Sequence, residues 1–275
     1  MPKDTRVCVC VCVFVMAATP EKEMAGYLVG AVRSVGVMPG PEMAEAFMKM
    51  GMSTKDDTGF EKVFLGPALT CSELGKDCPN MSFVMKLKSK DKAVEFYESE
   101  AYKAWASEFR VGENVMRDVR IIEAPADLFT PGKAYWIALI HHVLDTERFG
   151  AYFQAFVAAN EKGFEVTLDD GSTEKANLEI KFVGPSDFRE EAVKYVPAAG
   201  KGAPFLPGTS TDTGIVLVAE LASHAIGATF KACVDYKNTM LAAFNETFTD
   251  DVSYDAKVKV FMEEIFRRDV RIIAV

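Results

Sequence analysis

Two adjacent histidines, His141 and His142, are the strongest candidates for catalysis in this 275-residue sequence. They lie near the end of an apolar segment, Tyr135–Val143, whose composition is typical of a β-strand. Because side chains alternate across a strand, His141 shares a face with Tyr135 and His142 takes the opposite face. Only one of them can therefore enter a given site. An imidazole with a pKa of about 6.5 could act there as a general base, and a structural histidine at the strand end is the alternative.

A repeated Arg-Asp-x-Arg segment is the second candidate site. The run Arg-Asp-Val-Arg-Ile-Ile occupies residues 117–122 and again residues 268–273. In a strand, Asp118 and Arg120 share one face, and so do Asp269 and Arg271. If these arginines face a cavity, we expect Arg120 and Arg271 to bind a carboxylate or an enolate. The alternative is a solvated strand edge at which each aspartate neutralises its neighbouring arginine.

The six cysteines offer little evidence of metal binding. Cys8, Cys10 and Cys12 alternate with valine, which indicates a strand with same-face residues about 6.6 Å apart. This spacing is too long for thiolates that share one zinc at about 2.3 Å. We therefore expect reduced, buried, metal-free thiols. Cys71 and Cys78 flank a short loop and could form a disulfide in an oxidising compartment.

The first eighteen residues allow two interpretations. Lys3 and Arg6 precede an apolar stretch that ends in Met16-Ala17-Ala18, as in a cleaved signal peptide. The alternation of valine and cysteine and the lack of leucine favour a strand instead. We expect the strand and a cytoplasmic protein, and the signal peptide remains the alternative.

Composition excludes several classes of protein. The net charge is −9, and no block of lysine and arginine could follow a phosphate backbone, so we expect no nucleic-acid partner. No apolar run reaches the roughly 18 residues needed to cross a bilayer, so we expect no membrane partner. The chain also lacks the P-loop, Rossmann, GxSxG and HExxH motifs, and we expect no cofactor.

An internal repeat divides the chain into two units. Landmarks recur in the same order before each copy of the Arg-Asp-x-Arg segment. The matched pairs are Gly40-Pro41 with Gly184-Pro185, Phe64–Pro67 with Phe205–Gly208, and Phe83–Leu87 with Ile215–Ala219. A proline- and glycine-containing stretch separates the copies. We predict one unit over residues 1–124, a linker over 125–132 and a second unit over 133–275.

Each unit is predicted to contain a strand, helix, strand, helix, two strands, a helix and a strand. In the first unit we expect strands at 7–16, 35–38, 61–66, 82–88 and 116–123, with helices at 20–31, 41–50 and 90–110. In the second we expect strands at 135–143, 164–168, 178–183, 203–207, 215–221 and 268–273. Its helices are expected at 146–161, at 186–195 and over 223–266, with Asp145 as an N-cap and a break near 249–253.

The pattern resembles a small family of unknown function in the dimeric α/β-barrel superfamily, which includes antibiotic-biosynthesis monooxygenases and stress-responsive barrel proteins. The residues that carry the resemblance are Phe83–Leu87, Phe96–Glu100, Arg110 and Val119–Glu123, then Tyr135–Ile140 and Asp145–Phe149. The resemblance implies an α+β fold of two tandem ferredoxin-like βαββαβ units, here with an extra βα segment in each. It also implies that their sheets pack face to face as an intrachain dimeric α/β barrel.

Three classes of function fit these observations. The first is a barrel that binds a hydrophobic or anionic small molecule, with Tyr135, one histidine and either Arg120 or Arg271 on the wall between the sheets. The second is a cofactor-independent oxygenase or isomerase for a carbonyl or phenolic compound, with His141 or His142 as base. The third is a structural or assembly protein. The chain is expected to be a monomer with pseudo-dimeric halves, or a homodimer.

Overall fold

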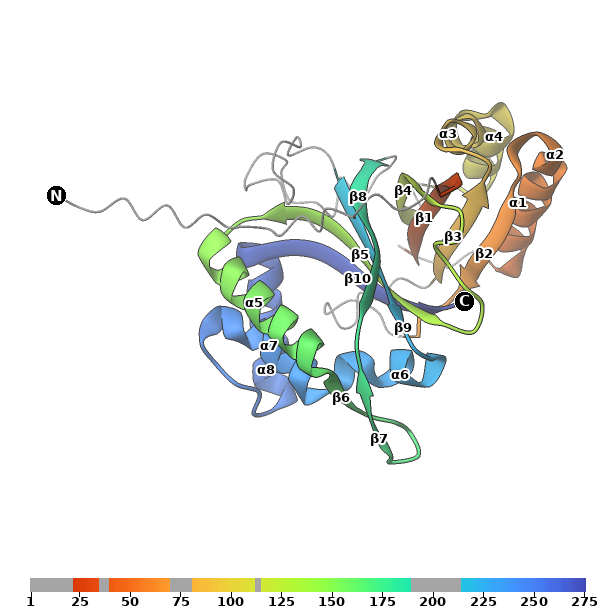
Figure 1. Ribbon diagram of the computed structural model, residues 1–275. Coiled ribbons are helices and arrows are strands. Elements are labelled where there is room, and N and C mark those ends of the chain that lie inside the picture. The colour runs from red at the N-terminus through yellow and green to blue at the C-terminus, as the bar shows by residue number, and fades with distance from the viewer. Residues whose placement is uncertain (1–21, 35–39, 70–80, 112–114, 189–213) are drawn as a thin grey trace.

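A computed structural model describes residues 22–34, 40–69, 81–111, 115–188 and 214–275. The described part of the first unit has the order strand, helices, two strands, helices, strand (Figure 1). Its elements are β1 (Met24–Ser34), α1 (Pro41–Ser53), α2 (Lys55–Thr58), β2 (Glu61–Gly66), β3 (Met81–Leu87), α3 (Lys90–Glu98), α4 (Glu100–Glu108) and β4 (Val115–Pro125). The strands pair antiparallel in the order β4-β1-β3-β2, which is the order of a ferredoxin-like sheet.

The second unit repeats this arrangement. Its elements are β5 (Ala134–Val143), α5 (Thr146–Lys162), β6 (Phe164–Thr167), β7 (Thr173–Ala176), β8 (Glu179–Phe188), β9 (Gly214–Leu221), α6 (His224–Thr229), α7 (Val234–Leu241), α8 (Asp251–Val260) and β10 (Phe266–Ala274). Strands β10-β5-β9-β8 form the sheet, and β6 pairs with β7 as a separate hairpin. A π-helical turn, Phe261–Ile265, connects α8 to β10.

The two sheets join into one eight-stranded sheet that curls into a nearly closed barrel. At one junction Ile121 of β4 pairs with Asp187 of β8. At the other, the Leu69 N–H donates to the Ile272 carbonyl at 2.8 Å. The helices lie outside the barrel, with α1 to α4 on one sheet and α5, α7 and α8 on the other (Figure 1). The expected α+β class and tandem α/β barrel are therefore confirmed.

Three apolar cores hold these layers together. Two of them lie between a sheet and its helices, one in each unit. The third lies between the sheets. Its members are Ala25, Tyr27, Val29, Val84, Ile122, Ala124, Leu128, Tyr135, Ile137, Leu139, Val216, Val218 and Ile273. The barrel interior is thus lined by apolar side chains from both sheets.

Capping residues set several helix boundaries. The Asp145 carboxylate accepts the N–H groups of Glu147 and Arg148, as expected of an N-cap. The predicted helix at 90–110 is instead two helices. Ser99 has an extended ψ of 151° between them, and its hydroxyl accepts the Tyr102 N–H, which starts α4. This serine therefore ends one helix and caps the next.

The predicted helix at 20–31 is wrong, because Met24–Ser34 forms strand β1. Tyr27 and Val29 face the barrel while Leu28 and Val32 face the helices, so the strand is buried on both sides. Such a strand shows a continuous apolar run, in which periodicity cannot separate strand from helix. The extra βα segment expected in the first unit is consequently absent from its described residues. The strands expected at 7–16, 35–38 and 203–207 lie outside the described part.

Two predicted pairs of repeat landmarks are also wrong, namely Gly40-Pro41 with Gly184-Pro185 and Phe64–Pro67 with residues 205–208. Phe64 pairs with Val84 in β2 and β3, and Phe182 pairs with Val218 at the corresponding point of β8 and β9. The structural counterpart of Phe64-Leu65-Gly66-Pro67 is therefore Phe182-Val183-Gly184-Pro185, not residues 205–208. Pro185 lies inside β8, so residues 186–188 continue a strand instead of opening the helix predicted at 186–195. A Gly-Pro step suits a helix start, but proline φ also fits an extended strand.

Candidate functional site

The two Arg-Asp-x-Arg segments occupy equivalent strands, β4 and β10. Arg120 lies opposite Val29 of β1, and Arg271 lies opposite Ile137 of β5. Alternation directs Asp118, Arg120, Asp269 and Arg271 into the barrel, on the face that also carries its apolar core. We name these four residues the polar layer.

Each arginine of the polar layer is bonded to the aspartate two residues before it. Arg120 Nε donates to Asp118 Oδ1 at 2.9 Å, and Arg271 Nη2 donates to Asp269 Oδ2 at 2.7 Å. Both arginine side chains are only 1% exposed, so the alternative of a solvated edge is wrong, although the aspartate partners that it predicted are present. Burying these charges is tolerable because each pair is neutral overall.

The two ion pairs also act on each other across the barrel. Burial lowers the pKa of Arg120, and Asp118 opposes that effect by favouring the charged guanidinium. Asp269 raises the pKa of Arg120 as well, whereas Arg271 lowers it. The strands of the two units therefore bring the repeated charges into one electrostatic cluster.

Gly214, at the start of β9, makes room for the guanidinium of Arg120. A Cβ atom at position 214 would lie 1.6 Å from Arg120 Nη1 and 3.0 Å from Ser186 Oγ. Ser186 pairs with Gly214 on the neighbouring strand β8. The arginine thus extends from β4 across β8 toward β9, and a larger residue at position 214 would displace it.

We expect Gly214→Ala to destabilise the protein by about 1–3 kcal/mol, because the new methyl overpacks the buried polar layer. Urea unfolding followed by circular dichroism measures this loss. Gly150→Ala is the matched control, since nothing lies within 4 Å of a Cβ at that helical position. The control should raise stability by about 0.5–1 kcal/mol. Equal stability of the two variants would contradict the contact.

Several buried polar atoms in the barrel make no hydrogen bond within the described residues. They include Nε and Nη1 of Arg271 and the hydroxyl oxygens of Ser82 and Ser186. A guanidinium carries five N–H donors, and Asp269 accepts from Nη2 alone among those of Arg271. Buried donors of this kind are costly unless an acceptor uses them. The polar layer therefore has donor capacity for an oxygen-bearing ligand.

Tyr135 lies on the barrel face, but its hydroxyl is used elsewhere. The hydroxyl accepts the Thr130 N–H at 2.5 Å and donates to Glu220 Oε2 at 3.2 Å. Burial raises the pKa of this phenol. Tyr27, its counterpart in β1, donates to the Pro125 carbonyl at 2.9 Å. Both tyrosines hold the connection between the units, and none of these three hydrogen bonds involves the arginines.

The backbone of His141 and His142 belongs to β5, as expected. The pairing with β10 shifts there, since Ile140 lies opposite Arg268 and His142 opposite Arg267, so the register skips His141. The histidine side chains lie outside the part of the chain that the structure describes. Their catalytic role remains a prediction.

Sequence reasoning missed the first arginine of each repeat. Arg117 points to the helices, where Nη1 donates to the Tyr102 hydroxyl at 2.9 Å and the guanidinium lies over the rings of Tyr102 and Trp105. Arg268 does the same in the second unit, donating to the hydroxyls of Tyr152 and Tyr236. Both arginines are 2% exposed, and their cation–π contacts fix helices to sheet.

A spacing in the sequence marks these partners. Phe96, Ser99 and Tyr102 recur as Phe230, Cys233 and Tyr236, with two residues between successive members. Ser99 and Cys233 both cap a helix, and the tyrosine three positions later reaches the arginine.

Burial raises the pKa of the Cys233 thiol to about 11. The other five cysteines lie outside the described residues.

No cluster of three histidine, cysteine, aspartate or glutamate side chains among the described residues could hold a metal ion. None of the described helices is long and apolar enough to cross a bilayer.

Comparisons with known proteins gave only distant matches. No family model and no curated protein matches the sequence. An anthrone oxidase-like protein matches at 10% identity and a TM-score of 0.36, with 93% of each chain covered. A chlorite dismutase variant from Candidatus Nitrospira defluvii matches at 9% and 0.34, covering 93% of this chain and 92% of that one. The dye-decolorizing protein from V. cholerae matches at 9% and 0.35, covering 92% and 94%. The fold described here therefore rests on its own strand order.

Proposed function

We propose that this protein is an α/β barrel that binds a small anionic molecule between its two sheets. The observation that carries this proposal is the set of unused N–H donors on buried Arg271. Arg120 supports the proposal, because Asp269 and Arg271 both affect its pKa and its charge therefore belongs to the same polar layer. An unpaired buried donor costs about 1–3 kcal/mol, and a ligand oxygen in this layer would offset that cost.

The surroundings favour a carboxylate or enolate on an apolar body. The oxygen atoms would meet Nε and Nη1 of Arg271, because the fixed, planar donors of a guanidinium suit a carboxylate. The remainder of the ligand would meet the apolar barrel core, which includes Ile137, Leu139 and Val216. Such a combination of a few polar groups and an apolar lining is typical of small-molecule sites.

The architecture supports two further parts of the proposal. The βαββαβ order of elements in each unit favours membership of the uncharacterised family of the dimeric α/β-barrel superfamily. In this proposal the units are residues 1–124 and 133–275, and residues 125–132 are the linker between them. Both barrel junctions form within one chain, which favours a monomer with pseudo-dimeric halves. The cytoplasmic location, the lack of a nucleic-acid partner and the oxygenase or isomerase activity remain predictions.

Titration calorimetry with hexanoate tests the proposed site, and hexanamide serves as its neutral counterpart. We expect hexanoate to bind at least about tenfold more tightly, because charge-assisted hydrogen bonds to arginine require the carboxylate. The double variant Asp269→Asn with Arg271→Gln should lose this preference while keeping a neutral pair in the core. Arg148→Gln, at a half-exposed surface arginine, is the control. Equal binding of both probes, or an unaffected double variant, would refute the site.

A further inference from the structure

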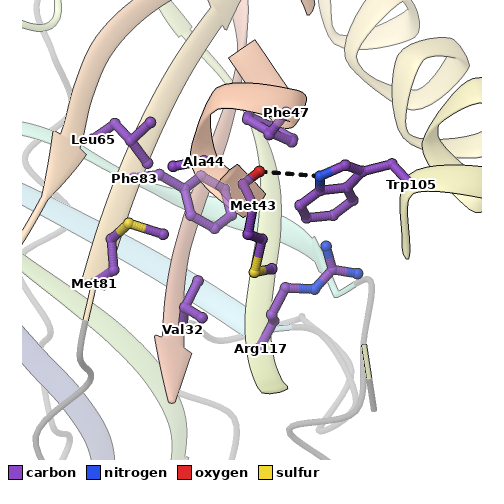
Figure 2. A pocket seen from close by; sticks show the side chains of 9 residues that line it. All are labelled: Val32, Met43, Ala44, Phe47, Leu65, Met81, Phe83, Trp105 and Arg117. Atoms are coloured by element: carbon purple, nitrogen blue, oxygen red, sulfur yellow. Dashed lines mark hydrogen bonds between the residues drawn. The ribbon is translucent and has the colours of Figure 1, made fainter. Parts of the chain in front are cut away.

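A small cavity lies on the helix side of the first sheet, away from the polar layer. Its volume is about 20 Å³, which is room for one water molecule. Figure 2 shows that its lining comes from α1, α4 and the sheet. Its lining residues include Met43, Ala44, Phe47, Met81, Trp105 and Arg117. Arg117 supplies the only charge among the lining residues.

Helices α1 and α5 occupy corresponding places in the two units, which allows the cavity to be compared with its counterpart. Counted from the N-caps Gly40 and Asp145, Ala44 corresponds to Phe149, and Phe47 corresponds to Tyr152. A third pair supports this register. Gly51 lies against Phe60, and its counterpart Phe156 lies 5.7 Å from Phe164, the residue that corresponds to Phe60.

Aromatic rings fill the counterpart region of the second unit. Phe149 lies 4.7 Å from Phe266, and the Arg268 guanidinium lies 5.3 Å from the Phe266 ring centre. In the first unit Ala44 takes the place of Phe149. Val115, two residues before Arg117, takes the place of Phe266. Among the described residues, the first unit therefore lacks counterparts of the rings of Phe149 and Phe266 near its buried Arg117.

From this comparison we propose that the cavity is the closed form of a second binding site, which takes a molecule with a single aromatic ring. The ring would occupy the place that Phe149 fills in the second unit. Because Arg117 and Trp105 both line the cavity, the ring would contact the guanidinium of Arg117 by a cation–π interaction and the indole of Trp105 by ring packing. Met43 and Met81 form the walls in Figure 2, and their unbranched side chains can change rotamer to enlarge the space.

Phenol is the probe, and Trp105 is the reporter. The chain has two tryptophans, so Trp136→Phe leaves Trp105 as the only source of indole fluorescence. In that variant we expect phenol to change the emission in a saturable way. Cyclohexanol, which has a similar size but no aromatic ring, should bind about tenfold more weakly because it makes no cation–π contact.

A larger side chain at position 44, which would fill the cavity, provides the decisive test of phenol binding. Ala44→Phe restores the ring found in the second unit and should weaken phenol binding by at least about tenfold. Ala101→Phe, at an exposed position of α4, is the matched control and should bind phenol like the parent. If Ala44→Phe fails to fold by circular dichroism, Ala44→Leu replaces it with the same expectation.

Three outcomes would overturn the proposal. They are the absence of saturable phenol binding in the parent, equal binding of phenol and cyclohexanol, and unchanged phenol binding when position 44 is filled. Hexanoate binding at the polar layer should be unaffected by Ala44→Phe. The two sites can therefore fail independently of each other.

Discussion

Replacing Arg271 with alanine is expected to destabilise the folded protein by about 3–5 kcal/mol, because the change removes the guanidinium that pairs with the buried carboxylate of Asp269. Asp269 is 7% exposed, and Arg271 Nη2 donates to its Oδ2 at 2.7 Å. The aspartate could escape this cost only by taking up a proton or by forcing the barrel open to water. Urea unfolding followed by circular dichroism measures the loss.

Replacing both members of the pair separates the cost of a lone charge from the cost of lost packing. We expect the double variant Asp269→Leu with Arg271→Met to recover most of the stability lost in Arg271→Ala, because apolar residues of similar size can replace a buried ion pair without loss. Exposed pairs behave differently and contribute about 0–1 kcal/mol. Lys103→Ala, which breaks an exposed pair with Glu100, is the control. A double variant as unstable as Arg271→Ala would show that packing, not charge, dominates.

The sequence was sufficient to predict which residues of the polar layer share a face. Alternation within the repeated segment requires Asp118 to lie beside Arg120 and Asp269 beside Arg271, and the structure has both pairs. Alternation does not determine what covers that face. The burial of the layer depends on the second sheet, which lies across the barrel and is far away in the sequence. A solvated edge and a barrel interior therefore give the same local pattern.

The missed features have similar physical causes. Strand β1 is buried on both faces, so its sequence lacks the alternation that would distinguish it from a helix. Nothing in the local sequence marks Arg117 and Arg268 as buried, because charged residues are usually exposed. Their aromatic partners come from helices whose docking the sequence does not specify. The recurring spacing of phenylalanine, a capping residue and tyrosine was the available signal, since it ends on Tyr102 and Tyr236.

Arg268→Ala is expected to cost about 3–5 kcal/mol, in the range of large-to-small changes in a core. The side chain is 2% exposed, and its guanidinium lies 4.9–5.9 Å from the ring centres of Trp136, Tyr152, Phe261 and Phe266. Truncation would leave a cavity and would also remove the donor that serves the hydroxyls of Tyr152 and Tyr236. Urea unfolding of the purified variant checks this value.

Graded substitutions show which part of Arg268 matters. Arg268→Met keeps most of the volume and should recover part of the loss, whereas Tyr152→Phe, which removes one hydroxyl, should cost only about 1 kcal/mol. The equivalent change in the first unit, Arg117→Ala, should cost less than Arg268→Ala. Arg117 already borders a cavity, and Ala44 and Val115 stand where the second unit has Phe149 and Phe266, of which Phe266 lies against Arg268. Equal losses at the two positions would mean that the extra rings of the second unit contribute nothing to holding its arginine.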